Sequence, residues 1–219
     1  MKRLLATAIC LLCVTVTTVF GQGKAQVRFL AESVSDDLGK IVCVSDGKAG
    51  AEFSLATSQL SEAATVHSRV LGLQAVSDKR KLGIVTLPDA GSSFVVLLIP
   101  DAEGAFKSVV VDADSRSFQS GDVFLYNHTD KKIAGNLGDS PFELAPDEGK
   151  KVRPGGDFPE GSYKVAFNVR EETGDRVLRT MLWPVLTRSR SYCFFFLNPV
   201  RNRIEFRAVE EFVADGNKR

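Results

Sequence analysis

The chain of 219 residues carries 28 basic and 27 acidic side chains, which gives a formal net charge of +1 at pH 7. A nucleic-acid-binding domain normally carries a strongly basic surface, so this balance argues against nucleic acid as a partner. Hydrophobic residues make up 44% of the chain. A chain of this size and composition can bury one large core or two smaller ones.

The first residues carry the pattern of an export signal. Lys2 and Arg3 form a short basic segment, and Leu4 to Phe20 follows without a charge. Gly21 offers a small residue for cleavage, so we expect residues 1–21 to be a signal peptide. The alternative is an uncleaved membrane anchor, although the apolar segment is slightly short for a spanning helix.

Export determines what we expect of the mature chain. Loss of Lys2 and Arg3 would change the formal net charge from +1 to −1. No second long apolar run follows, so we expect no transmembrane segment after cleavage. The expected location is periplasmic or extracellular.

Short segments with strand composition follow one another, with turn residues roughly every ten positions. In the first half they are Val27–Ala31, Ile41–Val44, Glu52–Leu55, Thr65–Val70, Leu71–Val76, Leu82–Leu87, Ser93–Ile99 and Phe106–Val111. In the second half they are Asp122–Tyr126, Ile133–Leu137, Lys151–Arg153, Ser162–Val169, Val177–Trp183, Tyr192–Leu197 and Arg203–Ala208. This spacing is typical of sandwiches and barrels, and the lack of long helical segments argues against a parallel α/β sheet.

Two of these segments are apolar at successive positions. Ser93–Ile99 and Tyr192–Leu197 have no polar alternate, so each predicts a central strand covered on both faces. Arg203–Ala208 instead alternates charged and apolar residues, which is typical of a strand with one buried and one wet face.

The sequence therefore predicts an all-β protein built as an antiparallel β-sandwich. We expect two sandwiches in tandem, residues 22–111 and 112–209, followed by a polar tail at 210–219. One larger sandwich is the alternative, because the segment 112–121 is no longer than an ordinary loop. No internal repeat of fixed period is visible.

The turns carry a general resemblance to a known class of module. Leu144 to Gly149 reads Leu-Ala-Pro-Asp-Glu-Gly, and expected strands end at Pro88-Asp89 and Pro100-Asp101. With an exported chain, this resembles the immunoglobulin-like β modules of bacterial envelope proteins. The resemblance covers architecture alone and implies no functional site.

Two cysteines, Cys43 and Cys193, remain after the signal segment. Export would allow a disulfide between them. Both lie inside apolar runs with nothing to indicate that they face each other. We therefore favour two separate buried thiols that pack as small hydrophobic side chains.

Catalytic and metal-binding patterns are weak in this sequence. His67 and His128 are the only histidines, and their spacing forms no metal motif, so we expect surface histidines, no metal and no cofactor. No Gly-x-Ser-x-Gly elbow is present. The acids at Asp112 and Asp114 fit a hydrogen-bonded turn better than a calcium loop, because Arg116 occupies the next ligand position.

Three surface features remain. Five arginines near the end of the chain could form one basic patch for an anionic glycan or a carboxylate-bearing partner, although a solvated sheet face is the simpler interpretation. They are Arg188, Arg190, Arg201, Arg203 and Arg207. Trp183 and Tyr192 could form a sugar-binding platform but fit core packing better. Asn127 begins a glycosylation triplet and is expected in a surface turn.

These observations favour a non-enzymatic, exported protein with a binding or structural role at the cell envelope. Its partner would be an envelope protein or an anionic glycan. Strand addition at Val27–Ala31 or Arg203–Ala208 would be one mechanism of binding. The alternative is a small secreted hydrolase or carbohydrate-active protein with dispersed acidic residues. A metal protein resembling cupredoxins is a third hypothesis.

Overall fold

The computed structural model describes residues 24–114 and 116–213, and all its regular structure is β-strand, as the sequence predicts. The expected signal peptide lies outside the described residues. The strands of the first half are β1 (Ala25–Ala31), β2 (Lys40–Ser45), β3 (Lys48–Ser54), β4 (Ala64–Val66), β5 (Val70–Ala75), β6 (Lys81–Thr86), β7 (Ser93–Pro100) and β8 (Phe106–Asp112). Those of the second half are β9 (Val123–His128), β10 (Ile133–Leu137), β11 (Ser140–Leu144), β12 (Gly149–Val152), β13 (Ser162–Glu171), β14 (Gly174–Pro184), β15 (Ser189–Asn198) and β16 (Arg203–Phe212).

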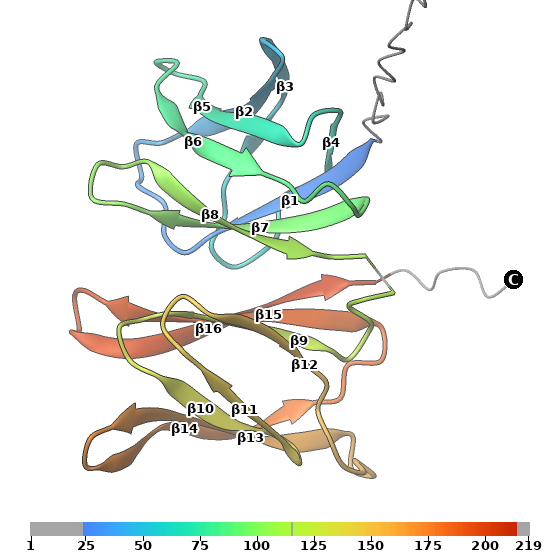
Figure 1. Ribbon diagram of the computed structural model, residues 1–219, viewed down its shortest axis with the longest axis vertical. Coiled ribbons are helices and arrows are strands. Elements are labelled where there is room, and N and C mark those ends of the chain that lie inside the picture. Colours follow the sequence, from blue (N-terminus) through green and yellow to red (C-terminus); the bar gives the residue numbers. More distant parts are fainter. Residues whose placement is uncertain (1–23, 115, 214–219) are drawn as a thin grey trace, which may run out of the picture.

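The strands form four sheets stacked in two pairs, which gives two sandwiches in tandem (Figure 1). In the N-terminal sandwich the sheet orders are β3-β2-β5-β6 and β4-β1-β7-β8. In the C-terminal sandwich they are β12-β9-β15-β16 and β11-β10-β13-β14. We call β4-β1-β7-β8 and β12-β9-β15-β16 the facing sheets, because they lie against each other in the middle of the stack.

The two sandwiches share one topology. Adding eight to each strand number of the N-terminal sandwich gives the strand order of the C-terminal sandwich, sheet by sheet. The sequence shows no such repeat. A sandwich is specified by alternating apolar positions and turns, which many unrelated residue choices satisfy, so the architecture can recur without a visible sequence period.

Each facing sheet contains one parallel pair among its antiparallel ones. β1 runs parallel to β7, with Val27 opposite Phe94. β15 runs parallel to β9, with Cys193 opposite Leu125. Parallel neighbours need a long connection, and here the strands that lie between them in the chain provide it.

Each sandwich has its own aromatic core. In the N-terminal core the rings of Phe29 and Phe53 stack with centroids 4.8 Å apart. In the C-terminal core Phe167 meets Phe195 edge to face at 4.9 Å, and Phe206 at 5.0 Å. Such pairs add about 0.5–1.5 kcal/mol each to the burial of the rings.

The two strands with apolar residues on both faces lie across from each other between the sandwiches. In β7, alternate residues point into the N-terminal core, namely Phe94, Val96 and Leu98. The residues between them point toward the other sandwich, namely Val95, Leu97 and Ile99. In β15, Cys193 and Phe195 enter the C-terminal core, and Tyr192 and Phe194 face the N-terminal sandwich. The second buried face that the sequence predicts is therefore supplied by the neighbouring sandwich.

Polar contacts join the two sandwiches beside this apolar contact. His128 Nδ1 lies 2.6 Å from Glu32 Oε2, and Lys107 Nζ lies 3.0 Å from Asp147 Oδ2. Arg207 donates to the carbonyl oxygen of Glu32 at 2.7 Å. Charged groups of both halves therefore meet along one edge of the apolar contact, where they fix the relative position of the sheets.

A second polar cluster lies at the end of β16. Arg190 is 4% exposed and Glu211 is 8% exposed, and Arg190 Nε lies 2.7 Å from Glu211 Oε2. The Tyr192 hydroxyl donates to the same carboxylate oxygen at 2.6 Å. Arg28 of β1 contacts Oε1 of Glu211 at 3.2 Å, so the cluster also joins the two sandwiches.

This cluster corrects one boundary. The polar tail was expected to begin at Glu210, but β16 continues to Phe212 because Glu211 is held by buried partners. Within residues 24–114 and 116–213, no helix has the length and apolar character needed to cross a bilayer.

Candidate binding site

The two sandwiches differ at one pair of edges. In the N-terminal sandwich β6 lies along β8, and Ser108 Oγ donates to the carbonyl oxygen of Ile84 at 3.3 Å. Gly83 allows this approach, since a Cβ there would lie 2.5 Å from the carbonyl oxygen of Phe106. The equivalent strands of the C-terminal sandwich, β14 and β16, stand apart. The C-terminal sandwich is therefore open where its counterpart is closed.

A groove of about 500 Å³ occupies this opening. Its apolar lining residues are Leu178 of β14 with Ile204 and Phe206 of β16, and its charged ones are Arg176, Arg179, Arg201, Arg203 and Glu205. A smaller hollow of about 170 Å³ continues along β16, lined by Trp183, Pro184, Leu186, Ser191, Phe206, Ala208 and Glu210. Phe206 belongs to both, so one hollow surface follows β16 from Arg203 to Glu210.

The charge of the groove is unbalanced. Arg201 and Arg203 both contact Glu205 Oε1, at 3.1 and 2.8 Å. Hydrogen bonds from Asn198 and Arg203 lower the pKa of Glu205 to about 2, so this carboxylate stays ionised at neutral pH. It is the only acid among the described lining residues of the larger hollow, which present four guanidinium groups.

Arg179 holds an unusual position on β14. It lies opposite Phe167 in the register, on the side of the strand that faces the core. Met181 and Trp183 occupy the next two positions on that side and pack against the core. No ion pair of Arg179 occurs among the described residues, whereas Arg176 lies 2.7 Å from Glu171. The register is irregular at this point, so Leu178 packs against the core while the neighbouring Arg179 is exposed and lines the groove.

Among the described strands, β14 and β16 are edge strands, so both sides of the opening present backbone groups that no neighbouring strand of this set pairs with. Ser191 N donates to the carbonyl oxygen of Asp122, away from β16. The backbone N–H and C=O of its register partner Glu210 therefore point away from β15. By alternation, the backbone groups of Ala208 and Phe206 point away from β15 as well. On β14, the backbone groups of Leu182 point outward in the same way. The carbonyl oxygen of its register partner Lys164 accepts a hydrogen bond from the N–H of Gly138, which lies on the far side of β13.

The five arginines that could have formed one patch do not share one surface. Arg201 and Arg203 line the groove. Arg190 is buried and donates to the carbonyl oxygen of Phe118 at 2.6 Å, because a guanidinium in the interior must use its donors. Arg207 reaches the boundary between the sandwiches, and Arg188 covers the ring of Phe212 at 4.9 Å.

The aromatic and cysteine pairs are also separated. Trp183 packs edge to face on Phe167 at 5.9 Å in the C-terminal core, while Tyr192 is buried between the sandwiches, so the two form no platform. Cys43 belongs to the N-terminal core and Cys193 to the C-terminal core, and both are free and buried. In this structure the two thiols are therefore separate, each packed in a different core.

The Asn127 triplet lies on a buried side chain, which corrects the expectation of a surface turn. Asn127 is fully buried, and its Nδ2 donates to the carbonyl oxygens of Lys131, Leu144 and Ala145 at 2.8, 3.3 and 3.0 Å. A glycan could not be attached there without breaking these bonds. His67 is exposed, whereas His128 pairs with Glu32 rather than lying free on the surface.

The loop between the sandwiches contains the expected hydrogen-bonded turn. Asp112 Oδ1 accepts from the backbone N–H of Asp114 at 3.0 Å, and its Oδ2 accepts from the Ser117 hydroxyl at 2.9 Å. These carboxylate oxygens satisfy backbone and hydroxyl donors. Across residues 24–114 and 116–213, no three His, Cys, Asp or Glu side chains gather as metal ligands would.

Glycosidic cleavage usually needs two carboxyl groups flanking the bond. The described lining of the larger hollow supplies Glu205, and that of the smaller hollow supplies Glu210 beside Trp183. Glu205 is held by two arginines. The Glu205 carboxylate is therefore already engaged in ion pairs.

Comparison with known proteins adds no functional assignment. No protein-family model matches the sequence, and no curated protein sequence matches it significantly. The site must therefore be interpreted from its own geometry.

Sequence reasoning found part of this site and missed the rest. It identified β16 as a place for strand addition, and β16 is an edge strand. The other candidate, Val27–Ala31, is excluded because β1 lies between β4 and β7. Arg176 and Arg179 were not singled out. The signal was present in the alternation of Arg179, Met181 and Trp183, where a charged residue precedes two residues that pack against the core.

Proposed function

We propose that this protein is an exported, non-enzymatic binding protein of the cell envelope that accepts an added β-strand at the opening between β14 and β16. The observation that carries the proposal is the difference between two topologically equal sandwiches. The same pair of edges is closed in one and open in the other.

Three properties of the opening support this mode of binding. Outward-facing amides and carbonyls on β16 can form ladder hydrogen bonds with a new strand. The half-buried Phe206 and Leu178 offer apolar surface to its side chains. Val209 of β16 packs in the apolar contact between the sandwiches, and this support lowers the cost of ordering the edge when a partner binds.

Hydrogen exchange tests strand addition directly. The amides of Phe206 and Ala208 face away from β15, whereas the amide of Arg207 faces it. An envelope extract that contains the partner should slow exchange at Phe206 and Ala208 and leave Arg207 nearly unchanged. Uniform protection of all three, or of none, would contradict strand addition.

A variant at Ala208 supplies the matched control. Ala208→Pro removes the outward N–H but no ladder bond to β15, so the variant should fold and lose the partner. Ala208→Gly keeps the N–H and should retain binding. Thermal unfolding of both variants verifies that the sandwich is intact. Equal capture of the partner by the two variants would refute the role of the β16 edge.

The export part of the proposal needs a separate experiment. The full chain, expressed with a C-terminal tag, should be found outside the cytoplasm with a mature N-terminus near Gln22. Fractionation followed by N-terminal sequencing checks both points. A cytoplasmic product that begins at Met1 would refute export.

A further inference from the structure

We infer that the strand accepted at the β14–β16 opening is an acidic peptide segment, with alternating Asp or Glu side chains. This inference rests on the proposed function and adds the chemical class of the partner. Its basis is the charge around the groove.

The groove offers more positive charge than its own residues neutralise. Four arginines line it, from β14 on one side and from β16 and its hairpin on the other. Glu171 pairs with Arg176 and Glu205 is shared by Arg201 and Arg203, so two of the four positive charges remain uncompensated by these acids. Carboxylates of a bound segment would receive charge-assisted hydrogen bonds from these guanidinium groups.

The arginines are placed where side chains of an added strand would reach. Arg203 and Glu205 project from one face of β16, while Ile204 and Phe206 project from the other. A segment paired with β16 would alternate in the same manner. One of its faces would meet apolar Leu178 and Phe206, and acids on the other would lie beside Arg203. A one-residue shift of register would turn the acids toward Arg179 instead.

A peptide fits the opening better than an anionic glycan does. A glycan would use the arginines but leave the outward-facing backbone groups of β16 and the apolar lining without partners. A second copy of this chain fits less well, because it would bring its own arginines against these. An extended acidic segment satisfies the charges, the backbone groups and the apolar surface together.

The experiment uses three decapeptides of alternating sequence, Val-Glu, Val-Gln and Val-Lys, with fluorescence anisotropy against the full mature protein. The Val-Glu peptide should bind at least about tenfold more tightly than Val-Gln, the loss expected for about one charge-assisted bond. Val-Lys should bind least. The preference should weaken at high salt, because exposed charges are screened.

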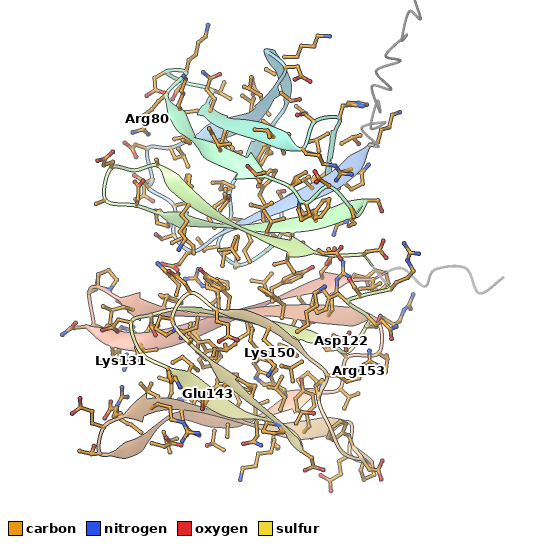
Figure 2. The ribbon with its side chains drawn as sticks, in the orientation of Figure 1. Arg80, Asp122, Lys131, Glu143, Lys150 and Arg153 are labelled. Carbon is orange, nitrogen blue, oxygen red and sulfur yellow. The ribbon has the colours of Figure 1, made fainter. Side chains whose placement is uncertain are left out.

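Variants of the groove residues show which arginines produce the preference for the Val-Glu peptide. Arg203→Gln should weaken Val-Glu binding by about tenfold when the acids lie beside Arg203, and Arg179→Gln should do so in the shifted register, so one of the two variants loses affinity and neither changes Val-Gln binding. Glu205→Gln should tighten Val-Glu binding, because it removes the competing carboxylate. Arg80→Gln is the charge-matched control, since Arg80 lies in the N-terminal sandwich, away from the opening (Figure 2).

The outcomes separate this inference from the proposal on which it rests. Equal binding of Val-Glu and Val-Gln, with loss in Ala208→Pro, would overturn the acidic preference and leave strand addition standing. A different outcome would point to a glycan. If a sulfated polysaccharide displaced the Val-Glu peptide and the Phe206 amide showed no protection from hydrogen exchange, the inference would be overturned. No binding of any peptide would overturn it as well, and the arginines would then serve to keep two open edges from self-pairing.

Discussion

The imidazole Nδ1 of His128 lies 2.6 Å from Oε2 of Glu32, and these two residues belong to different sandwiches. The hydrogen bond to Glu32 raises the pKa of His128, and burial opposes it. Asp147 also favours the charged imidazole, whereas Lys107 disfavours it. Protonation of His128 therefore strengthens this contact between the two sandwiches.

The sign of the pH dependence of this contact follows from the raised pKa of His128. The ion pair contributes its full stability below the ordinary histidine pKa of 6.5 and loses it as pH rises through the higher pKa of the folded protein. We expect His128→Gln to lower stability by up to about 1 kcal/mol at acidic pH, since the half-exposed pair is screened by solvent, and to have less effect at alkaline pH. Urea unfolding at several pH values checks this, and Glu32→Gln should reproduce it. A difference in unfolding free energy between the unchanged protein and His128→Gln that widens with rising pH would contradict the assignment.

The buried pair of Arg190 and Glu211 should be expensive to break. Removing one partner leaves an uncompensated charge in the interior, so we expect Glu211→Gln to cost about 3 kcal/mol in the free energy of unfolding. The double variant Arg190→Met with Glu211→Leu should recover part of this loss, because it removes both charges. Glu210→Gln is the control, since Glu210 is exposed and its replacement should change stability by less than about 0.5 kcal/mol. Guanidinium denaturation measures all three.

The closed edge of the N-terminal sandwich depends on Gly83. Its φ of +142° and the 2.5 Å approach of a Cβ to the carbonyl oxygen of Phe106 both exclude a side chain. We expect Gly83→Ala to cost about 1–3 kcal/mol and to speed amide exchange in β6 and β8. Gly72→Ala is the matched control in β5, where a Cβ would have no contact closer than 3.6 Å. Equal stability of the two variants would show that the closure does not depend on this glycine.

The sequence predicted the strands well because alternation and turn residues are local signals. Its most informative segments were Ser93–Ile99 and Tyr192–Leu197, for which it correctly required cover on both faces. It could not say what supplied the second cover. That depends on how two sandwiches pack, and no local pattern records it.

The candidate site was harder to predict for a related reason. Arg190, Arg201 and Arg207 look alike in the sequence, but one is buried, one lines the groove and one joins the sandwiches. Their roles depend on partners distant in the chain, such as Phe118 and Glu32. The burial of Asn127 was missed for the same reason, because the carbonyls it serves belong to turns that meet it only in the fold.

The shared topology of the halves has one more consequence. Equivalent sheets meet through equivalent faces, as the two subunits of a symmetric homodimer do. In this protein the two sandwiches take the place of the subunits, and the connection between β8 and β9 joins them in one chain. Their association is therefore unimolecular, and dilution would not separate them.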